Sequence, residues 1–214
     1  TNIKDVNFTE EEYTYLLDNL GKNFVMLASE DLINQALNDI NSIEVLEPDG
    51  GIMPLADGEL YFFPFGVKTG ERKYVFSIAT SWTKMPSVRS FDVLGIYWGT
   101  SNFTITEFEA TQRTMNAGFV NYNRNGTNTK ETSLGIATSM NLINDASTYN
   151  LDLDIDGEFS SSGTYKINFA YLHSTTPINL SQSHSFTFSQ SGLGGVAYYS
   201  SASLRNQFEV KSAS

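Results

Sequence analysis

Residues 73–98 read KYVFSIATSWTKMPSVRSFDVLGIYW. The runs at 74–80 and 91–98 are rich in Val, Ile, Phe and Tyr, which favour strands at the centre of a β-sheet. The polar connector between them contains Pro86, which has no N–H to donate to a sheet ladder. The segment therefore predicts two core strands separated by a loop.

From the turn sequence PDGG at 48–51 onward, short β-prone runs alternate with turn residues. These runs lie near 59–65, 73–81, 91–98, 103–110, 117–122, 133–142, 149–155, 164–172, 184–190, 195–200 and 206–210. No convincing helical pattern separates them, which argues against parallel βαβ units. We therefore predict an all-β, mainly antiparallel protein built as a β-sandwich of about ten strands.

The loop at 99–102 is expected to close a β-hairpin in which Trp98 pairs with Phe103. Alternation of inward and outward side chains fails a few residues further on. A β-bulge near Thr106 would restore it and turn Phe108 inward.

The N-terminal part of the chain is expected to be helical. Thr9 and Glu12 have the spacing of a capping box in front of an apolar stripe, and Ser29 is placed to cap a second helix. Two helices of this length have too little mutual surface to be stable by themselves. We therefore predict an acidic helical hairpin in residues 1–47 that packs on a β-sandwich domain in residues 48–214.

The net charge of −11 disfavours nucleic acids and anionic membrane surfaces as partners, because both require basic patches. Residues 1–59 carry 13 acidic and 2 basic side chains, whereas residues 60–214 carry 11 of each. The acidity therefore belongs to the N-terminal part. No apolar run approaches the roughly 18 residues that a transmembrane helix needs, so we expect no such segment.

Cysteine is absent, which excludes disulfides, thiolate zinc sites and thiol catalysis. A composition rich in Ser, Thr, Asn and Gly without cysteine is common among exported proteins of Gram-positive bacteria. Secreted eukaryotic domains of this size usually carry disulfides. We therefore expect a secreted or cell-surface bacterial protein.

Trp82, Arg89 and Asp92 lie in or beside the loop of the opening segment, where antiparallel sandwiches carry binding residues. Two interpretations remain open for them. Arg89 and Asp92 form a structural ion pair under a packed tryptophan, or the three residues form an aromatic platform with polar neighbours, as in sugar-binding sandwiches.

Asp152, Asp154 and Asp156, followed by Gly157, resemble the first half of a calcium loop of the EF-hand type. The second half departs from that pattern, because Gly163 stands where the bidentate glutamate is needed. Calcium at the three aspartates is therefore the less favoured interpretation.

The same aspartates alternate with apolar residues, which is typical of a strand with its carboxylates facing outward. We prefer this interpretation and expect the strand to form a hairpin with the next one. In that hairpin Leu153 faces Ile167, and Asp154 lies beside Lys166.

Glu107 and Glu109 place two carboxylates on one face of a strand, an arrangement similar to that of glucanase-type sandwiches with a Glu-x-Asp-x-x-Glu motif. Gln112 stands where the last glutamate of that motif is needed, so exposed strand acids are the preferred interpretation. His173 and His184 have neither the partners nor the spacing of a zinc or Ser-His-Asp site.

These observations favour binding over catalysis. We predict an exported bacterial, non-enzymatic protein that binds extracellular or cell-envelope polysaccharide or a protein partner. One alternative is a glycoside hydrolase with a concanavalin-like sandwich, which needs two carboxylates about 5 to 9.5 Å apart in a groove. Another is an oligomerising or pore-forming β-protein, suggested by the Ser/Thr-rich alternating residues 183–203. We expect no cofactor, and calcium at the three aspartates is the less favoured alternative.

Overall fold

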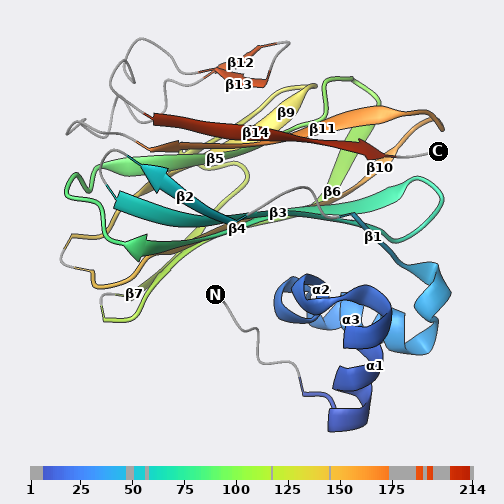
Figure 1. The fold of residues 1–214 in the computed structure, drawn as a ribbon. Helices are drawn as coiled ribbons and strands as arrows, with labels where there is room; N and C mark the ends of the chain where they lie inside the picture. The colour runs from blue at the N-terminus through green and yellow to red at the C-terminus, as the bar shows by residue number, and fades with distance from the viewer. Residues whose placement is uncertain are drawn as a thin grey trace.

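Two antiparallel β-sheets lie face to face in the computed structural model, and three α-helices lie under one of them (Figure 1). The structure describes residues 7–46, 51–55, 58–116, 118–144, 146–173, 187–189, 192–194 and 203–212, with side chains for 7–46, 58–116, 118–144 and 146–173. The predicted all-β class and the sandwich with N-terminal helices are confirmed.

The first sheet, called sheet A, has the strand order β1-β3-β4-β10-β6-β7, and β2 also pairs with β3. Its strands are β1 (Glu44–Leu46), β2 (Gly51–Leu55), β3 (Gly58–Lys68), β4 (Lys73–Lys84), β6 (Phe103–Thr114), β7 (Gly118–Tyr122) and β10 (Asn150–Phe159). One face of this sheet packs on the second sheet, and we call the opposite face the outer face.

The second sheet, called sheet B, has the order β14-β11-β5-β9-β8. Its strands are β5 (Phe91–Tyr97), β8 (Thr129–Glu131), β9 (Gly135–Asn141), β11 (Tyr165–His173) and β14 (Ser203–Ser212). A separate small pair is formed by β12 (Thr187–Ser189) and β13 (Gly192–Gly194). Of the segment 183–203, only this pair and the first residue of β14 belong to the part that the structure describes.

The helices are α1 (Glu10–Leu20), α2 (Lys22–Leu27) and α3 (Glu30–Asn38), followed by a 3₁₀ turn, η1 (Ile40–Ser42). The predicted capping box is present: the backbone N–H of Glu12 donates to Thr9 Oγ1 at 3.1 Å, and the N–H of Thr9 donates to Glu12 Oε1 at 3.0 Å. Ser29 caps α3, as expected. The sequence interpretation missed α2, because Gly21, with φ of 87°, starts a new helix directly after α1.

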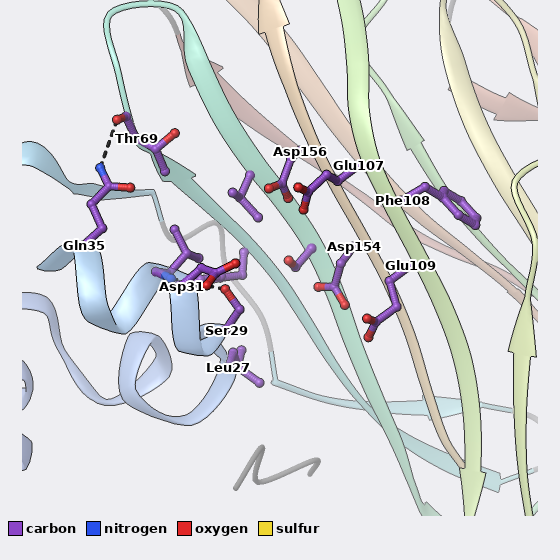
Figure 2. A pocket seen from close by; sticks show the side chains of 14 residues that line it. Leu27, Ser29, Asp31, Gln35, Thr69, Glu107, Phe108, Glu109, Asp154 and Asp156 are labelled. Carbon is purple, nitrogen blue, oxygen red and sulfur yellow. Dashed lines mark hydrogen bonds between the residues drawn. The ribbon is translucent and has the colours of Figure 1, made fainter. Parts of the chain in front are cut away.

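The helices pack on the outer face of sheet A rather than standing apart from it. An apolar cluster joins Leu16, Phe24 and Ile33 of the helices to Phe65 of β3 and Val75 of β4. A polar contact adds to this cluster, since Gln35 Nε2 on α3 donates to the carbonyl of Thr69 at 3.1 Å (Figure 2). The predicted domain boundary at 47 and 48 lies outside the described residues and stays a prediction.

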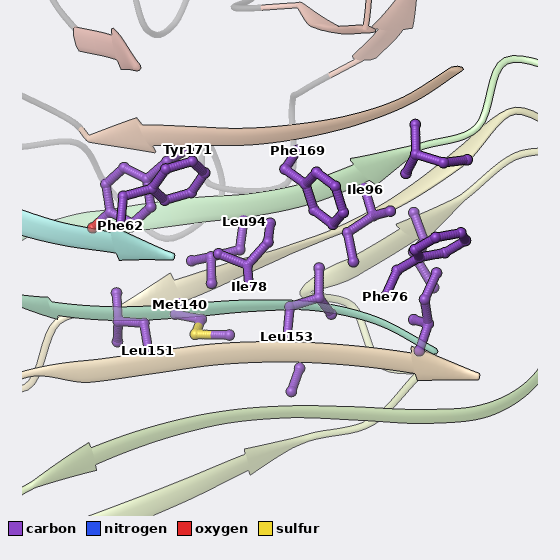
Figure 3. Packing of buried hydrophobic residues seen from close by; sticks show 14 of the residues in the cluster. Phe62, Phe76, Ile78, Leu94, Ile96, Met140, Leu151, Leu153, Phe169 and Tyr171 are labelled. Atoms are coloured by element: carbon purple, nitrogen blue, oxygen red, sulfur yellow. The ribbon is translucent and has the colours of Figure 1, made fainter. Parts of the chain in front are cut away.

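The main core fills the space between the two sheets (Figure 3). The apolar residues of β10, which are Leu151, Leu153 and Ile155, are fully buried there. They meet side chains from sheet B such as Leu94 and Phe169. The aspartates between them face the other way, so the predicted strand with outward carboxylates is confirmed.

The predicted hairpin between residues 98 and 103 is wrong. β5 belongs to sheet B and β6 to sheet A, so residues 98–102 cross from one sheet to the other. Trp98 and Phe103 do meet, with ring centroids 4.9 Å apart, but as core side chains and not as a hairpin pair. A short loop between two β-prone runs suits both arrangements. β5 is buried along its whole length, so its burial pattern shows no alternation that would have fixed its pairing.

The predicted bulge at Thr106 is present, although its partner strand is β10. Asp156 pairs with Glu107 and Gly157 pairs with Ile105, which leaves Thr106 as the extra residue. Phe108 is half-buried against the core, as expected.

The second predicted hairpin is also wrong, since β10 and β11 lie in different sheets. Asp154 pairs with Ser77 and Glu109, and Lys166 pairs with Lys211. Gly157, which follows the three aspartates, lies within β10. A Cβ there would stand 2.2 Å from Phe103 Cζ, so glycine is required for close packing.

No helix among the described residues combines the length and the apolar character needed to cross a bilayer. The strand expected at 195–200 and the side chain of His184 lie outside the described residues.

Candidate binding face on sheet A

The outer face of sheet A is only partly covered by the helices. Alternate residues of β3, β4, β10, β6 and β7 point to this face, and strand pairing arranges them in rows across the sheet. The helices cover the rows that contain Phe65 and Val67 at the β3 side. Two clefts open beside them, one aromatic and one acidic.

The aromatic end of the face is built around Tyr61 and Phe63. Their rings stack with centroids 5.6 Å apart and an interplanar angle of 12°, and both side chains are half-buried. They are two residues apart on β3, so their side chains leave the same face of the strand. A cleft of about 430 Å³ lies beside them, bordered by α2, by Ser81 and Thr83 of β4 and by Asp152 of β10.

Polar and aromatic side chains continue the row of Tyr61 across the sheet. From β3 to β7, one residue on each strand belongs to this row, in the order Tyr61, Ser81, Asn150, Arg113 and Phe119. The Arg113 guanidinium lies over the ring of Phe119, 5.4 Å from its centroid, and Phe119 is 54% exposed.

The acidic end of the face lies beside α3 (Figure 2). Asp154 stands directly opposite Glu109, and Asp156 directly opposite Glu107, on adjacent strands. With Asp31 of α3 these four carboxylates line a cleft of about 340 Å³. None of the described residues that line it is Lys, Arg or His.

The bulge at Thr106 sets the direction of the two glutamates. Phe103 and Ile105 face the core before it, and Phe108 packs against the core after it, so Glu107 and Glu109 face outward. Without the extra residue, the alternation that starts at Phe103 would direct both glutamates into the core. The bulge is therefore what brings them into the same cleft as the β10 aspartates.

Ser77 of β4 lies in the same row as Asp154 and Glu109. It lines the acidic cleft and is 6% exposed. Its neighbours Phe76 and Ile78 point into the core, so the serine side chain points to the outer face. Its hydroxyl has no hydrogen-bond partner among the described residues.

The sequence-predicted residues Trp82, Arg89 and Asp92 do not form one exposed surface. Trp82 and Asp92 are 3% and 0% exposed, and the indole Nε1 donates to Asp92 Oδ2 at 3.2 Å. Trp82 borders the aromatic cleft but offers no free ring face, so the stacking platform expected at this tryptophan is wrong. The reason is the alternation of side chains along a strand: Trp82 lies four residues after Ile78 on β4, so both side chains point into the core.

The expected Arg89–Asp92 ion pair is replaced by other contacts. Arg89 is half-buried and donates from Nε to the carbonyl of Pro86 at 3.3 Å and from Nη1 to that of Ala146 at 2.7 Å. Its guanidinium also lies 5.7 Å from the centre of the Tyr149 ring. Arg89 thus braces the loop through backbone carbonyls.

Asp92 is instead the centre of a buried cluster. It accepts the hydroxyl of Tyr171 as well as the Trp82 indole, and its Oδ1 lies 2.7 Å from His173 Nδ1. The Trp82 and His173 rings meet edge-on with centroids 4.7 Å apart. All four side chains are buried, so this cluster joins β4 of sheet A to β5 and β11 of sheet B.

The three aspartates proposed for calcium lie on one strand and not in a loop. Asp152 borders the aromatic cleft, whereas Asp154 and Asp156 line the acidic one. Among the described residues, no group of three or more His, Asp or Glu side chains is arranged to hold a metal ion.

Gln112, in the position of the last glutamate of the glucanase-type motif, faces the core. Its side chain binds the carbonyl of Asn141, the N–H of Ile143 and the hydroxyl of Tyr122. Burial raises the pKa of Tyr122, and the bond from Gln112 opposes that rise. The carboxylates opposite Glu107 and Glu109 come from β10, and sequence reasoning missed this because the strands are distant in the chain.

The fold and this face together define an antiparallel β-sandwich with one partly open, aromatic and acidic outer surface. No protein-family model matches the chain, and no curated protein matches it.

Proposed function

We propose that the chain is a non-catalytic, exported bacterial protein that binds an extracellular or cell-envelope polysaccharide on the outer face of sheet A. The observation that supports this most is the stacked pair of Tyr61 and Phe63 beside a cleft with polar neighbours. Sugar rings have apolar C–H faces that pack on aromatic rings and hydroxyls that need hydrogen bonds. Ligand sites combine apolar walls and a few placed polar groups in this way.

Size and surroundings also suit a sugar. The aromatic cleft, at about 430 Å³, is in the range of small-ligand sites. Ser81, Thr83 and Asp152 provide hydroxyl and carboxylate groups at its border. The row through Arg113 to Phe119 extends the surface beyond the cleft, as a polymer requires. Export agrees with a chain that contains no cysteine and has a strongly acidic composition.

The test is glycan binding by single variants. We expect Tyr61→Ala and Phe63→Ala each to weaken binding roughly thirtyfold, as for central aromatic residues worth about 2 kcal/mol. Tyr15→Ala is the matched control, because Tyr15 is a 43% exposed tyrosine on α1 that lines neither cleft. Affinity electrophoresis or titration calorimetry with bacterial envelope glycans measures the effect. Unchanged affinity in both variants would remove this face from consideration, and capture of a protein in place of glycans would favour the protein partner.

A second candidate function is glycoside hydrolysis on the same face. The two opposed carboxylate pairs in one cleft favour it, since residues directly opposite have Cβ atoms about 4.5–5.5 Å apart and diagonal ones about 7–8 Å. Side chains at these Cβ separations can bring their carboxyl groups to the about 5–5.5 Å of retaining enzymes or the about 6.5–9.5 Å of inverting enzymes. Release of reducing ends from a polysaccharide, lost in Glu109→Gln and Asp154→Asn, would establish hydrolysis. Intact polymer after prolonged incubation would contradict it.

A further inference from the structure

We propose that Arg113 and Phe119 form a second sugar-binding subsite on the outer face of sheet A. The ligand is then a linear polysaccharide that crosses the strands, with one sugar ring on Tyr61 and Phe63 and a later ring of the same chain on Phe119. This inference rests on the proposed function and adds to it the path and the minimum length of the ligand.

Phe119 supplies the apolar surface of the subsite. It lies on β7, at the end of the strand order of sheet A, and it is 54% exposed. Tyr122, three residues further on, packs against the core, so the Phe119 side chain points to the outer face. Single exposed apolar side chains are common on protein surfaces, so the assignment depends on the groups around this ring.

Arg113 supplies hydrogen-bond donors beside that ring. It is exposed, and its guanidinium lies 5.4 Å from the centroid of the Phe119 ring. The other arginines whose side chains the structure describes have partners: Arg72 and Arg124 pair with glutamates, and Arg89 donates to backbone carbonyls. Arg113 has no acceptor among the described residues, although acidic side chains outnumber basic ones 24 to 13 in the chain. Its planar set of N–H donors is therefore available to the hydroxyls of a sugar.

The hairpin of β6 and β7 holds the two side chains in place, since they stand directly opposite each other on these strands. At its turn, Thr114 Oγ1 donates to the carbonyl of Gly118 at 3.0 Å. The N–H of Met115 donates to Thr148 Oγ1 at 2.9 Å, which ties the turn to the segment before β10. A site that is ordered before binding loses less conformational freedom when the ligand arrives.

A row of residues connects the subsite to the aromatic cleft, in the order Tyr61, Ser81, Asn150, Arg113 and Phe119. Adjacent strands lie about 4.8 Å apart, so the row from β3 to β7 spans about 19 Å. Aromatic rings stand at both ends, and the half-buried polar side chains of Ser81 and Asn150 lie between them. This order suits a chain of sugars, whose ring faces pack on aromatic side chains and whose hydroxyls need hydrogen bonds.

The other path, along the strands into the acidic cleft, offers no exposed aromatic ring among the described residues. Of the phenylalanines that line that cleft, Phe65 is 2% exposed under the helices, and Phe108 is half-buried against the core. The row across the strands, in contrast, ends on the exposed ring of Phe119. The geometry therefore favours the path across the strands.

The experiment compares the disaccharide with the octasaccharide of two linear series, cello-oligosaccharides and chitin oligosaccharides, by titration calorimetry. The disaccharide is shorter than the row, and the octasaccharide is longer. We expect the octasaccharide to bind about tenfold more tightly or better, because its second contact is made within the same chain. Phe119→Ala should remove most of this gain and leave the affinity for the disaccharide unchanged, whereas Phe119→Tyr, which keeps a ring, should retain it. Arg113→Lys keeps the charge but loses the planar donors, and it should weaken octasaccharide binding severalfold.

Met115→Ala is the matched control, because Met115 is an 81% exposed apolar residue of the same hairpin that lies outside the row. Circular dichroism and melting confirm that each variant is folded. Unchanged octasaccharide affinity in Phe119→Ala, together with weaker binding in Tyr61→Ala, would overturn the second subsite and leave the proposed function standing. Equal losses in Phe119→Ala and Met115→Ala would show a general apolar contact of the hairpin and would also overturn it. Absence of binding to these and all other glycans would remove both the subsite and the proposed function.

Discussion

Asp92 shows how a residue that looks functional in the sequence is used for structure. Its carboxylate is fully buried and is contacted by Trp82, Tyr171 and His173 from both sheets. Burying a carboxylate is costly unless hydrogen bonds compensate it, and these three donors provide that compensation. The cluster therefore fixes the two sheets relative to each other at this end of the core.

Removal of this carboxylate should be strongly destabilising. We expect Asp92→Ala to lower the free energy of unfolding by about 3–5 kcal/mol, because buried donors are left without an acceptor. Urea unfolding measures the change. Arg89→Ala is the comparison. Because Arg89 is half-buried and donates to two backbone carbonyls, its removal should lower the free energy of unfolding by about 1–2 kcal/mol. A loss below about 1 kcal/mol for Asp92→Ala would mean that the cluster does not hold the sheets together.

At the scale of elements, the pairing of β6 with β10 creates the acidic cleft. Each strand alone carries outward acids, which is ordinary for a half-exposed strand. Their register, set by the bulge at Thr106, places Glu109 opposite Asp154 and Glu107 opposite Asp156. The two strands thus concentrate charge where a ligand could neutralise it, at the expense of stability.

The repulsion between these opposed carboxylates predicts that removing one charge stabilises the protein. Glu109→Gln should raise the free energy of unfolding by about 0.2–1 kcal/mol in low salt, because it relieves repulsion from Asp154. The gain should largely vanish at 1 M salt, where the Debye length is about 3 Å. Glu158→Gln should give no gain, since Glu158 lies near Arg72. Chemical denaturation at two salt concentrations measures both variants, and a destabilised Glu109→Gln would show that the carboxylate has a favourable contact.

At the scale of the whole molecule, the N-terminal helices complete sheet A. They cover Phe65, Val67 and Val75 of its outer face, and their residues also form one wall of each cleft. The helical segment thus serves both stability and the shape of the proposed binding face.

Deletion of residues 1–47 should lower the melting temperature and the solubility of the remainder, because the deletion exposes the apolar side chains of β3 and β4. Differential scanning calorimetry and size-exclusion chromatography measure these effects. Thr9→Ala, which removes only the cap of α1, should cost about 1 kcal/mol and leave solubility unchanged. An unaltered melt after deletion would show that the helices are an independent appendage.

Features that depend on neighbouring residues could be predicted from the sequence alone. The capping box at Thr9 and Glu12, the cap at Ser29, the outward aspartates of 152–156 and the bulge at Thr106 all follow from short patterns. Their physical causes are local, because they arise from backbone donors at a helix start and from the two-residue period of a strand. The all-β sandwich followed from the same periods.

Only the tertiary structure decided which strands pair and which side chains meet. Alternation tells which residues share a face but not which strand lies beside them, so a hairpin and a crossing between sheets look alike at residues 98–103 and 156–165. Tyr61 and Phe63 were hidden for a related reason: residues 60–65 are apolar at almost every position, so the sequence does not show which face is open. The acidic cleft needed the pairing of Glu109 with Asp154 and of Glu107 with Asp156, which are more than forty residues apart in the chain, and such pairing depends on the packing of the whole chain.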